Sequence, residues 1–277
     1  VTAVLLFAVY TGLAYVLVDV LGGAPLLSLT IVGGLAFVQL YYSDRLALRS
    51  MGAREVSESE DPELHAIVTQ LSQQANLPKP TVAVADMSVP NAFAAGRSPK
   101  AATVCVTSGL RDVLDREELE AVVAHELAHV KNRDAAVMTV ASFFSSVAFM
   151  VVRWGWLLGG GRGNRNAAPV WVAIGVSLVV WVISFFLIRA LSRYREFAAD
   201  RGAVTITGRP AALASALQTI SGTIDRVPED DLRERAEMNA FFIVPITTGV
   251  IGKLARTHPS TEHRIERLQE LERTMER

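Results

Sequence analysis

The stretch His125-Glu126-Leu127-Ala128-His129 places two imidazoles four residues apart, with a carboxylate directly after the first. On an α-helix, residues i and i+4 lie one above the other on the same face, so both rings can reach one metal ion. A catalytic Zn²⁺ site keeps one coordination position for water, and the carboxylate beside the first histidine can take that water's proton. The stretch therefore predicts a zinc peptidase site, with His125 and His129 as ligands and Glu126 as general base.

The residues before this stretch predict the helix that it requires. Asp115 is followed three residues later by Glu118, which is typical of a capping box at a helix start. Apolar residues then recur at helical spacing, and neither Gly nor Pro occurs from residue 116 to 133. The alternative is an ordinary amphipathic surface helix that carries two unrelated histidines.

The composition indicates a membrane protein with a polar part. Of the 277 residues 51% are hydrophobic, and the mean hydropathy of +0.31 is too high for an ordinary soluble enzyme. The net charge of −1 gives no reason to propose nucleic acid as a partner. Cys105 is the single cysteine, which excludes an internal disulfide and fits a reducing compartment. Because Cys105 lies in a β-branched run, we expect a buried strand residue and not a nucleophile.

Four apolar stretches are long enough, or nearly so, to cross a bilayer, whose hydrocarbon core is about 30 Å thick. They cover residues 1–21, 25–42, 135–152 and 169–188. The first lacks a basic leader and a cleavage site, so we expect a membrane span and not a signal peptide. Since the sequence begins at Val1 without Met, we also expect its numbering to start within a longer chain.

Basic residues concentrate at one set of ends of these stretches. At those ends lie Arg45, Arg49, Arg54, Lys131, Arg133, Arg189, Arg193, Arg195 and Arg201. At the opposite ends, the segment that connects the third and fourth stretches carries only Arg153, Arg162 and Arg165. The positive-inside rule then places both termini and the His-containing helix in the cytoplasm. That helix has no loop before the third stretch, so we expect its site close to the cytoplasmic membrane surface.

The expected fold is a mainly α membrane protein with about four transmembrane helices and a cytoplasmic α+β zinc-metalloprotease domain. Short strand-like runs at 81–85, 91–95 and 102–107 predict a small β-sheet in that domain. The predicted segments are a transmembrane hairpin at 1–43, a protease block with the metal motif at 44–134, a second hairpin at 135–189, and a helical block at 190–277. The cytoplasmic domain would therefore be built from two sequence blocks.

Two histidines do not complete a catalytic zinc site, so a third ligand is needed. Glu196 is the best candidate. If the third and fourth apolar stretches form an antiparallel hairpin, the chain returns at Glu196 to the height above the membrane at which it left after His129. Asp200 lies one helical turn further on the same face, where it could hold the remaining N–H of a histidine. The alternative is a charged helix near the membrane whose acidic residues pair with neighbouring arginines.

Taken together, these motifs resemble the HtpX-type integral-membrane zinc metalloproteases, which are gluzincins with the HExxH motif related to the CAAX prenyl endopeptidases. The resemblance covers nearly the whole chain. It implies one Zn²⁺ per chain held by His125, His129 and Glu196, with Asp200 as the acidic residue that supports a ligand. It also implies that the substrates are misfolded or damaged membrane proteins, and that the role is quality control under stress.

A second part of the resemblance concerns substrate binding. Residues Asn91, Ala92, Phe93 and Ala94 are similar to the family's strand beside the active-site cleft. An extended segment with small side chains could let a substrate backbone add as an extra strand. The alternative is an ordinary edge strand.

A third part of the resemblance lies near the C-terminus, where the family's motif is similar to residues 258–265, HPSTEHRI. The resemblance implies that His258 and Arg264 lie near the active site, either as structural residues or as groups that stabilise the oxyanion of the transition state. Without the resemblance, His258 before Pro259 would be interpreted as part of a turn that ends a helix.

We therefore expect a zinc-dependent endopeptidase in the cytoplasmic membrane of a prokaryote, with its active site facing the cytoplasm. Polypeptides, in particular membrane proteins, and the lipid bilayer are the expected partners, and the sequence predicts no oligomeric state. Two alternatives stay open. The chain could be a selective processing protease like the CAAX endopeptidases, or an inactive membrane scaffold that uses the helix only for structure.

Overall fold

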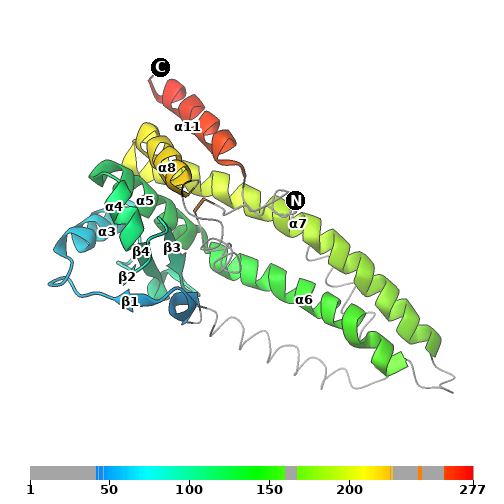
Figure 1. Ribbon diagram of the computed structural model, residues 1–277. Coiled ribbons are helices and arrows are strands. Elements are labelled where there is room, and N and C mark those ends of the chain that lie inside the picture. The colour runs from blue at the N-terminus through cyan, green and yellow to red at the C-terminus, as the bar shows by residue number, and fades with distance from the viewer. Residues whose placement is uncertain are drawn as a thin grey trace. The chain divides into compact units, whose positions relative to one another are not determined.

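The computed structural model describes residues 42, 44–45, 47–159, 167–224, 226, 243–244 and 259–276 (Figure 1). The chain divides into two compact units, each made of two sequence segments. The first unit comprises Val1–Tyr42 and Ala136–Leu191, and the second comprises Ser43–Ala135 and Ser192–Arg277. The membrane and cytoplasmic roles of the four predicted segments remain predictions.

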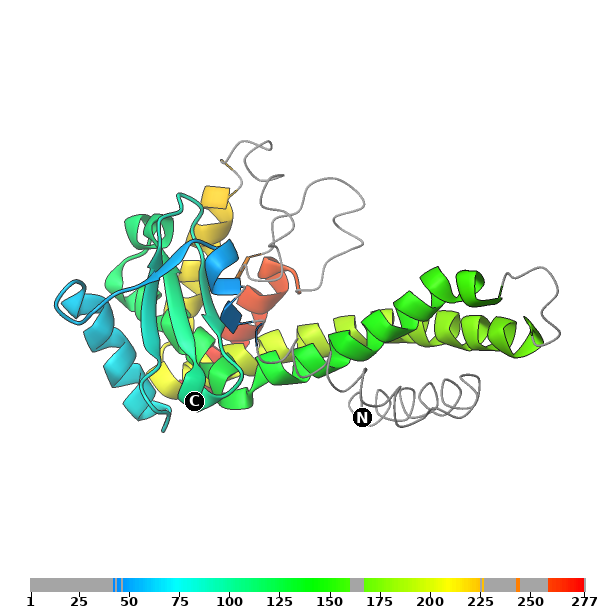
Figure 2. The ribbon, with the colours of Figure 1, turned by 90° about the horizontal axis from the view of Figure 1, so that it is seen from below.

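The second unit contains one four-stranded sheet with the strand order β1-β2-β4-β3. The strands are β1 (Ala53–Glu55), β2 (Thr81–Ala85), β3 (Ala92–Ala95) and β4 (Thr103–Thr107). The central pair β2 and β4 is parallel, whereas β1 and β3 pair antiparallel with their neighbours. Strand β3 therefore forms one edge of the sheet, whose strands lie side by side in Figure 2.

The β-branched run of β4 fills the centre of this sheet. Val104, Cys105 and Val106 are fully buried, as expected for a strand covered on both faces. Burial raises the pKa of the Cys105 thiol to about 12. The thiolate is the reactive form of cysteine, so this residue is a buried core side chain, as the sequence predicts.

The second unit also contains α-helices. They are α3 (Pro62–Gln74), α4 (Ser108–Val113), α5 (Arg116–Asn132), α8 (Pro210–Ile224) and α11 (Thr261–Met275). Helix α8 packs against both α5 and α11 (Figure 1). Leu127 on α5 and Leu213 and Leu217 on α8 are completely buried, and each such side chain contributes about 2 kcal/mol to the stability of the core.

Helix α5 begins with the predicted capping box. The Asp115 carboxylate accepts from the backbone N–H of Glu118 at 2.9 Å, and the Glu118 carboxylate accepts from the backbone N–H of Asp115 at 3.1 Å. Arg133 ends the helix in the left-handed region, with φ 55° and ψ 38°. Helix α6 (Asp134–Gly159) follows directly. The two helices are thus separated by a single residue.

Helix α7 (Ala167–Thr207) is 41 residues long, which corresponds to about 60 Å. Its stretch Ile174–Thr207 is the one described helix that is long and apolar enough to cross a membrane. Large apolar side chains such as Trp171 and Phe186 are exposed along α7. In α6 the described apolar stretch, Asp134–Phe143, is shorter. The predicted spans at 1–21 and 25–42 lie outside the described residues except for Tyr42, so the predicted number of four spans is not confirmed.

The architecture is otherwise as expected from the sequence, being mostly helical with one small sheet. The three predicted strand runs form β2, β3 and β4. Strand β1, which is three residues long, was not predicted.

Candidate metal centre

Three predicted ligand atoms meet inside the second unit. Nε2 of His125 lies 3.1 Å from Nε2 of His129 and 3.5 Å from Oε2 of Glu196. Nε2 of His129 lies 3.7 Å from Oε1 of Glu196. Tetrahedral zinc with bonds of about 2.0–2.1 Å requires its ligand atoms to be about 3.4 Å apart. The two imidazole nitrogens and the Glu196 carboxylate, one oxygen of which lies near each nitrogen, are therefore close enough together to be ligands of one zinc ion.

These three side chains come from two helices. On α5 the i, i+4 spacing stacks the two imidazoles, whose ring centroids are 4.7 Å apart and whose planes are nearly perpendicular. Glu196 on α7 supplies the third atom. His125 and Glu196 are almost completely buried, whereas His129 is partly exposed. Such a site would hold its ion within the protein and leave the side toward His129 accessible.

Asp200 and Arg264 support the first imidazole. Oδ1 of Asp200 lies 3.0 Å from Nδ1 of His125. Arg264 donates to both carboxylate oxygens of Asp200, at 2.6 and 2.9 Å, and its side chain is only 2% exposed. Burial would raise the pKa of Asp200, but the positive charges of Arg264 and His125 outweigh it and lower that pKa. Arg264 is thus bound to the carboxylate that lies next to His125.

A second carboxylate, which no sequence pattern indicates, supports the second imidazole. Oδ2 of Asp134 lies 2.6 Å from Nδ1 of His129 and 3.3 Å from Nε of Arg195. In the sequence, Asp134 is only the residue before an apolar stretch. Its spacing of five from His129 does not bring two residues together on a continuous helix, so no local pattern signals this contact.

Glu126 points toward the edge of the sheet. Its Oε2 accepts a hydrogen bond of 3.0 Å from the backbone N–H of Ala94 on β3. The side chain is 6% exposed, and its burial raises the pKa although His129 and His125 lower it. A carboxylate with a raised pKa next to a metal site is suited to accept and then return a proton near neutral pH.

The predicted substrate-binding residues lie on or next to this edge strand. Ala92, Phe93 and Ala94 belong to β3. Asn91 is fully buried, and its Oδ1 accepts from the backbone N–H of Ile243 at 3.0 Å. The amide of Asn91 therefore anchors another segment of the chain. His258 lies outside the described residues.

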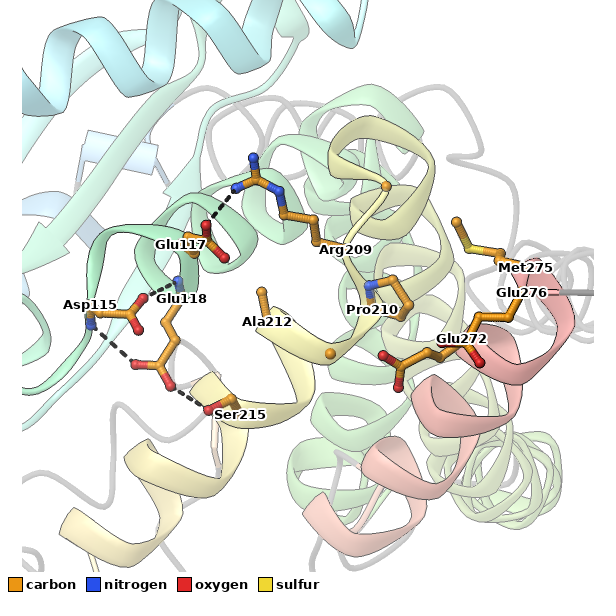
Figure 3. Close-up of a pocket in the computed structure, with 12 residues that line it drawn as sticks. Asp115, Glu117, Glu118, Arg209, Pro210, Ala212, Ser215, Glu272, Met275 and Glu276 are labelled. Carbon is orange, nitrogen blue, oxygen red and sulfur yellow. Dashed lines mark hydrogen bonds and ion pairs between the residues drawn. The ribbon is translucent and has the colours of Figure 1, made fainter.

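A separate hollow of about 530 Å³ contains none of the predicted site residues (Figure 3). It is lined by Asp115, Glu117, Glu118, Gly208, Arg209, Pro210, Ala211, Ala212, Ser215, Glu272, Met275 and Glu276. The buried Glu118 in this hollow is already bonded to Ser215 at 2.5 Å and to the capping box. The hollow therefore adds nothing to the metal centre.

Comparison with known proteins agrees with this geometry. Residues 58–272 match the model of peptidase family M48. The chain is 52% identical to protease HtpX homolog 2 of Methanosarcina acetivorans over 260 residues, which cover 92% of this chain and 87% of that protein. It is 54% identical to the HtpX homolog of Moorella thermoacetica over 244 residues, which cover 86% and 82% of the two chains.

A solved structure also resembles the chain. The crystal structure of Ste24p from S. mikatae aligns with a TM-score of 0.56 and 14% sequence identity, over 94% of this chain and 62% of that one. At this identity the likeness shows a shared fold alone, and the chain spans less than two thirds of Ste24p. The family match and the HtpX relatives extend over most of the chain, and the chain therefore belongs to peptidase family M48 as a metalloprotease of the HtpX type.

Proposed function

We propose that the protein is a membrane-bound zinc endopeptidase that hydrolyses unfolded or damaged membrane proteins. The observation that carries this proposal is the cluster of His125, His129 and Glu196 donor atoms with the Glu126 carboxylate next to it. This donor set suits Zn²⁺, because imidazole nitrogens combined with one carboxylate are typical of catalytic zinc. One ion per chain would be held there.

Glu126 is the proposed general base and then general acid. When bound, the zinc ion would acidify a water molecule and polarise the scissile carbonyl. Glu126 takes the proton of the water and returns it to the leaving amine. The N–H of Ala94 fixes one of its oxygens at 3.0 Å, which leaves the other oxygen for the proton. The raised pKa of Glu126 favours this exchange, because the same carboxyl has to gain and lose the proton in each cycle.

The edge strand β3 is the proposed binding site for the substrate backbone. In an antiparallel pair, successive residues direct their backbone groups alternately toward and away from the partner strand. The carbonyl of Asn91 accepts from the backbone N–H of Thr107, the last residue of β4, so the carbonyls of Ala92 and Ala94 face the open edge. A peptide that adds there is recognised mainly by its backbone. Recognition through the backbone supports a protease that cleaves a broad range of unfolded substrates, and not one that cleaves a single processing site.

The membrane part of the proposal rests on α7 and on the HtpX relatives. Within Ile174–Thr207, only 17% of the most apolar 18-residue window is buried, as in a lipid-facing helix. We place the protein in the cytoplasmic membrane of a prokaryote, with several spans and its active site facing the cytoplasm. A role in stress-induced quality control follows from the expected substrates.

The test compares wild type with Glu126→Gln after purification in detergent. Wild type should bind one zinc and cleave an unfolded membrane protein, and a chelator should stop the cleavage. Glu126→Gln should keep its zinc and lose at least about a hundredfold in rate, since general base catalysis contributes about that much. Glu117→Gln is a matched control on the same helix, because Glu117 is exposed. Full activity of Glu126→Gln would contradict the mechanism, and cleavage confined to prenylated peptides would favour the processing alternative.

A further inference from the structure

Two buried carboxylates hold the two imidazoles of the metal centre. Asp200 lies 3.0 Å from Nδ1 of His125, and Asp134 lies 2.6 Å from Nδ1 of His129. In both histidines it is the other nitrogen, Nε2, that faces Glu196. Each ring therefore directs Nε2 to the metal position and Nδ1 to a carboxylate.

Each carboxylate forms an ion pair with an arginine. Arg264 binds both oxygens of Asp200, and Nε of Arg195 lies 3.3 Å from Oδ2 of Asp134. Asp134 is only 6% exposed, and a buried carboxylate is strongly destabilising unless it is paired. Arg195 and His129 are the partners that the second unit supplies. Arg195 also precedes the ligand Glu196 on α7, so Asp134 connects residues from both helices of the site.

The backbone at the end of α5 makes this contact possible. On a continuous helix, residues five apart point about 140° away from each other, because one turn takes 3.6 residues. Arg133 adopts the left-handed conformation, with φ 55° and ψ 38°, and so ends α5. Asp134 then begins α6, and its carboxylate returns to His129. The first turn of a helix also favours a negative charge through the helix dipole.

We propose that Asp134 is a positioning residue of the metal centre. Its carboxylate accepts the Nδ1 proton of His129 and so presents Nε2 as the metal ligand, while Arg195 holds the carboxylate in place. A carboxylate behind a ligand histidine fixes its tautomer and orientation and increases its basicity. The inference rests on the proposed function, in which His129 binds zinc. If Asp134 served only to start α6, zinc affinity would not depend on it.

The test measures zinc affinity directly, without using activity. Full-length metal-free protein in detergent competes for zinc with a chromophoric chelator. Asp134→Ala should bind zinc about 10–100-fold more weakly than wild type, which is typical for loss of such a carboxylate. Asp134→Asn should lose less, because it keeps an acceptor oxygen without the charge, and Asp134→Glu should recover part of the affinity. Asp112→Asn is the matched control, since Asp112 is exposed on α4.

Cobalt provides a second readout. The visible absorption of Co²⁺-loaded protein reports the geometry of its ligands, so Asp134→Ala should shift the spectrum and Asp112→Asn should not. If wild type binds no metal, the proposed function itself fails. If wild type binds one zinc, and Asp134→Ala matches it in affinity and cobalt spectrum, this inference is wrong while the zinc site stands.

Arg195 gives an independent test should Asp134→Ala not fold. Arg195→Gln removes the guanidinium that holds Asp134 and should weaken zinc binding, although by less than Asp134→Ala. In an Asp134→Asn background the same change should add little, because residues that act through one contact are not additive. The proposed link between Arg195 and Asp134 would be overturned if Arg195→Gln left the zinc affinity unchanged. It would also be overturned if the losses of zinc affinity from the two changes were fully additive in the double variant.

Discussion

A proton and a metal ion compete for the imidazole of His125. Burial and the nearby charge of Arg264 lower its pKa, but hydrogen bonds with Asp200 and Glu196 outweigh them and raise it to about 9 in the metal-free protein. Only the neutral imidazole binds a metal, so zinc has to displace this proton throughout the neutral range. The contacts that orient His125 therefore also make its affinity for metal depend on pH.

We expect the zinc affinity of metal-free protein to rise about tenfold per pH unit through the neutral range, and to level off as the pH passes about 9. The direction follows from the sign of the shift, because a raised pKa keeps the competing proton bound below pH 9. Calorimetric titration in buffers of different ionisation enthalpy would count the released protons. Asp200→Asn removes one of the groups that raise the pKa of His125, so the zinc affinity of this variant should level off at lower pH. An affinity independent of pH between 6 and 9 would contradict this assignment.

At the residue scale, the sequence predicts what depends on local spacing. His125, Glu126 and His129 follow from a five-residue pattern on one helix. Asp134 could not be predicted in the same way, because its contact with His129 depends on the left-handed turn at Arg133. An arginine in that conformation is uncommon and has no sequence signal comparable to glycine.

At the scale of elements, one close contact sets how near α7 can come to α5. A Cβ atom added to Gly202 on α7 would lie 2.6 Å from Cβ of Ala128 on α5. Ala128 precedes the ligand His129, and α7 also carries Glu196 and Asp200. The absence of a side chain at Gly202 therefore lets the two helices place their ligand atoms within reach of one ion.

Gly202→Ala should destabilise the protein by about 1–3 kcal/mol, as expected for overpacking in a close-packed core. It should also weaken zinc binding, because separating the two helices moves Glu196 away from the histidines. Thermal unfolding of purified protein and chelator competition measure the two effects. Gly222→Ala on α8 is the control, since an added Cβ there meets no atom within 4 Å and alanine is the better helix former. If Gly202→Ala and Gly222→Ala were equal in stability and in zinc affinity, the close contact between α7 and α5 would not be required.

The elements themselves were predictable to different degrees. The capping box indicated the start of α5, and three β-branched or small-residue runs indicated β2, β3 and β4. Strand β1 has the sequence Ala-Arg-Glu, with no β-branched or aromatic residue, so it forms through its pairing with β2 and not through its own preference. The parallel pairing of β2 with β4 depends on the whole domain and has no local signal.

At the scale of the whole molecule, the distribution of basic residues predicts how the chain crosses the membrane. Arginine and lysine cluster beside the two metalloprotease segments and are few in the hairpin at 153–165. The positive-inside rule predicts that the clustered side faces the cytoplasm. The proposed ligands His129 and Glu196 lie on opposite sides of that hairpin in the sequence, so a shared metal centre requires both to face the same compartment. An even number of membrane crossings between them satisfies this requirement.

Cysteine labelling can test this orientation because the natural cysteine is buried. Cys105 is not exposed, and a Cys105→Ser background removes it altogether. Glu58→Cys lies at a site whose side chain is 76% exposed in the second unit, and Asn164→Cys lies in the predicted external hairpin. In intact cells, a membrane-impermeant maleimide should label Asn164→Cys and leave Glu58→Cys unlabelled, and lysis should expose both. The reverse pattern would place the metal centre outside the cytoplasm. It would then act on exported segments, because the site meets the polypeptides of its own compartment.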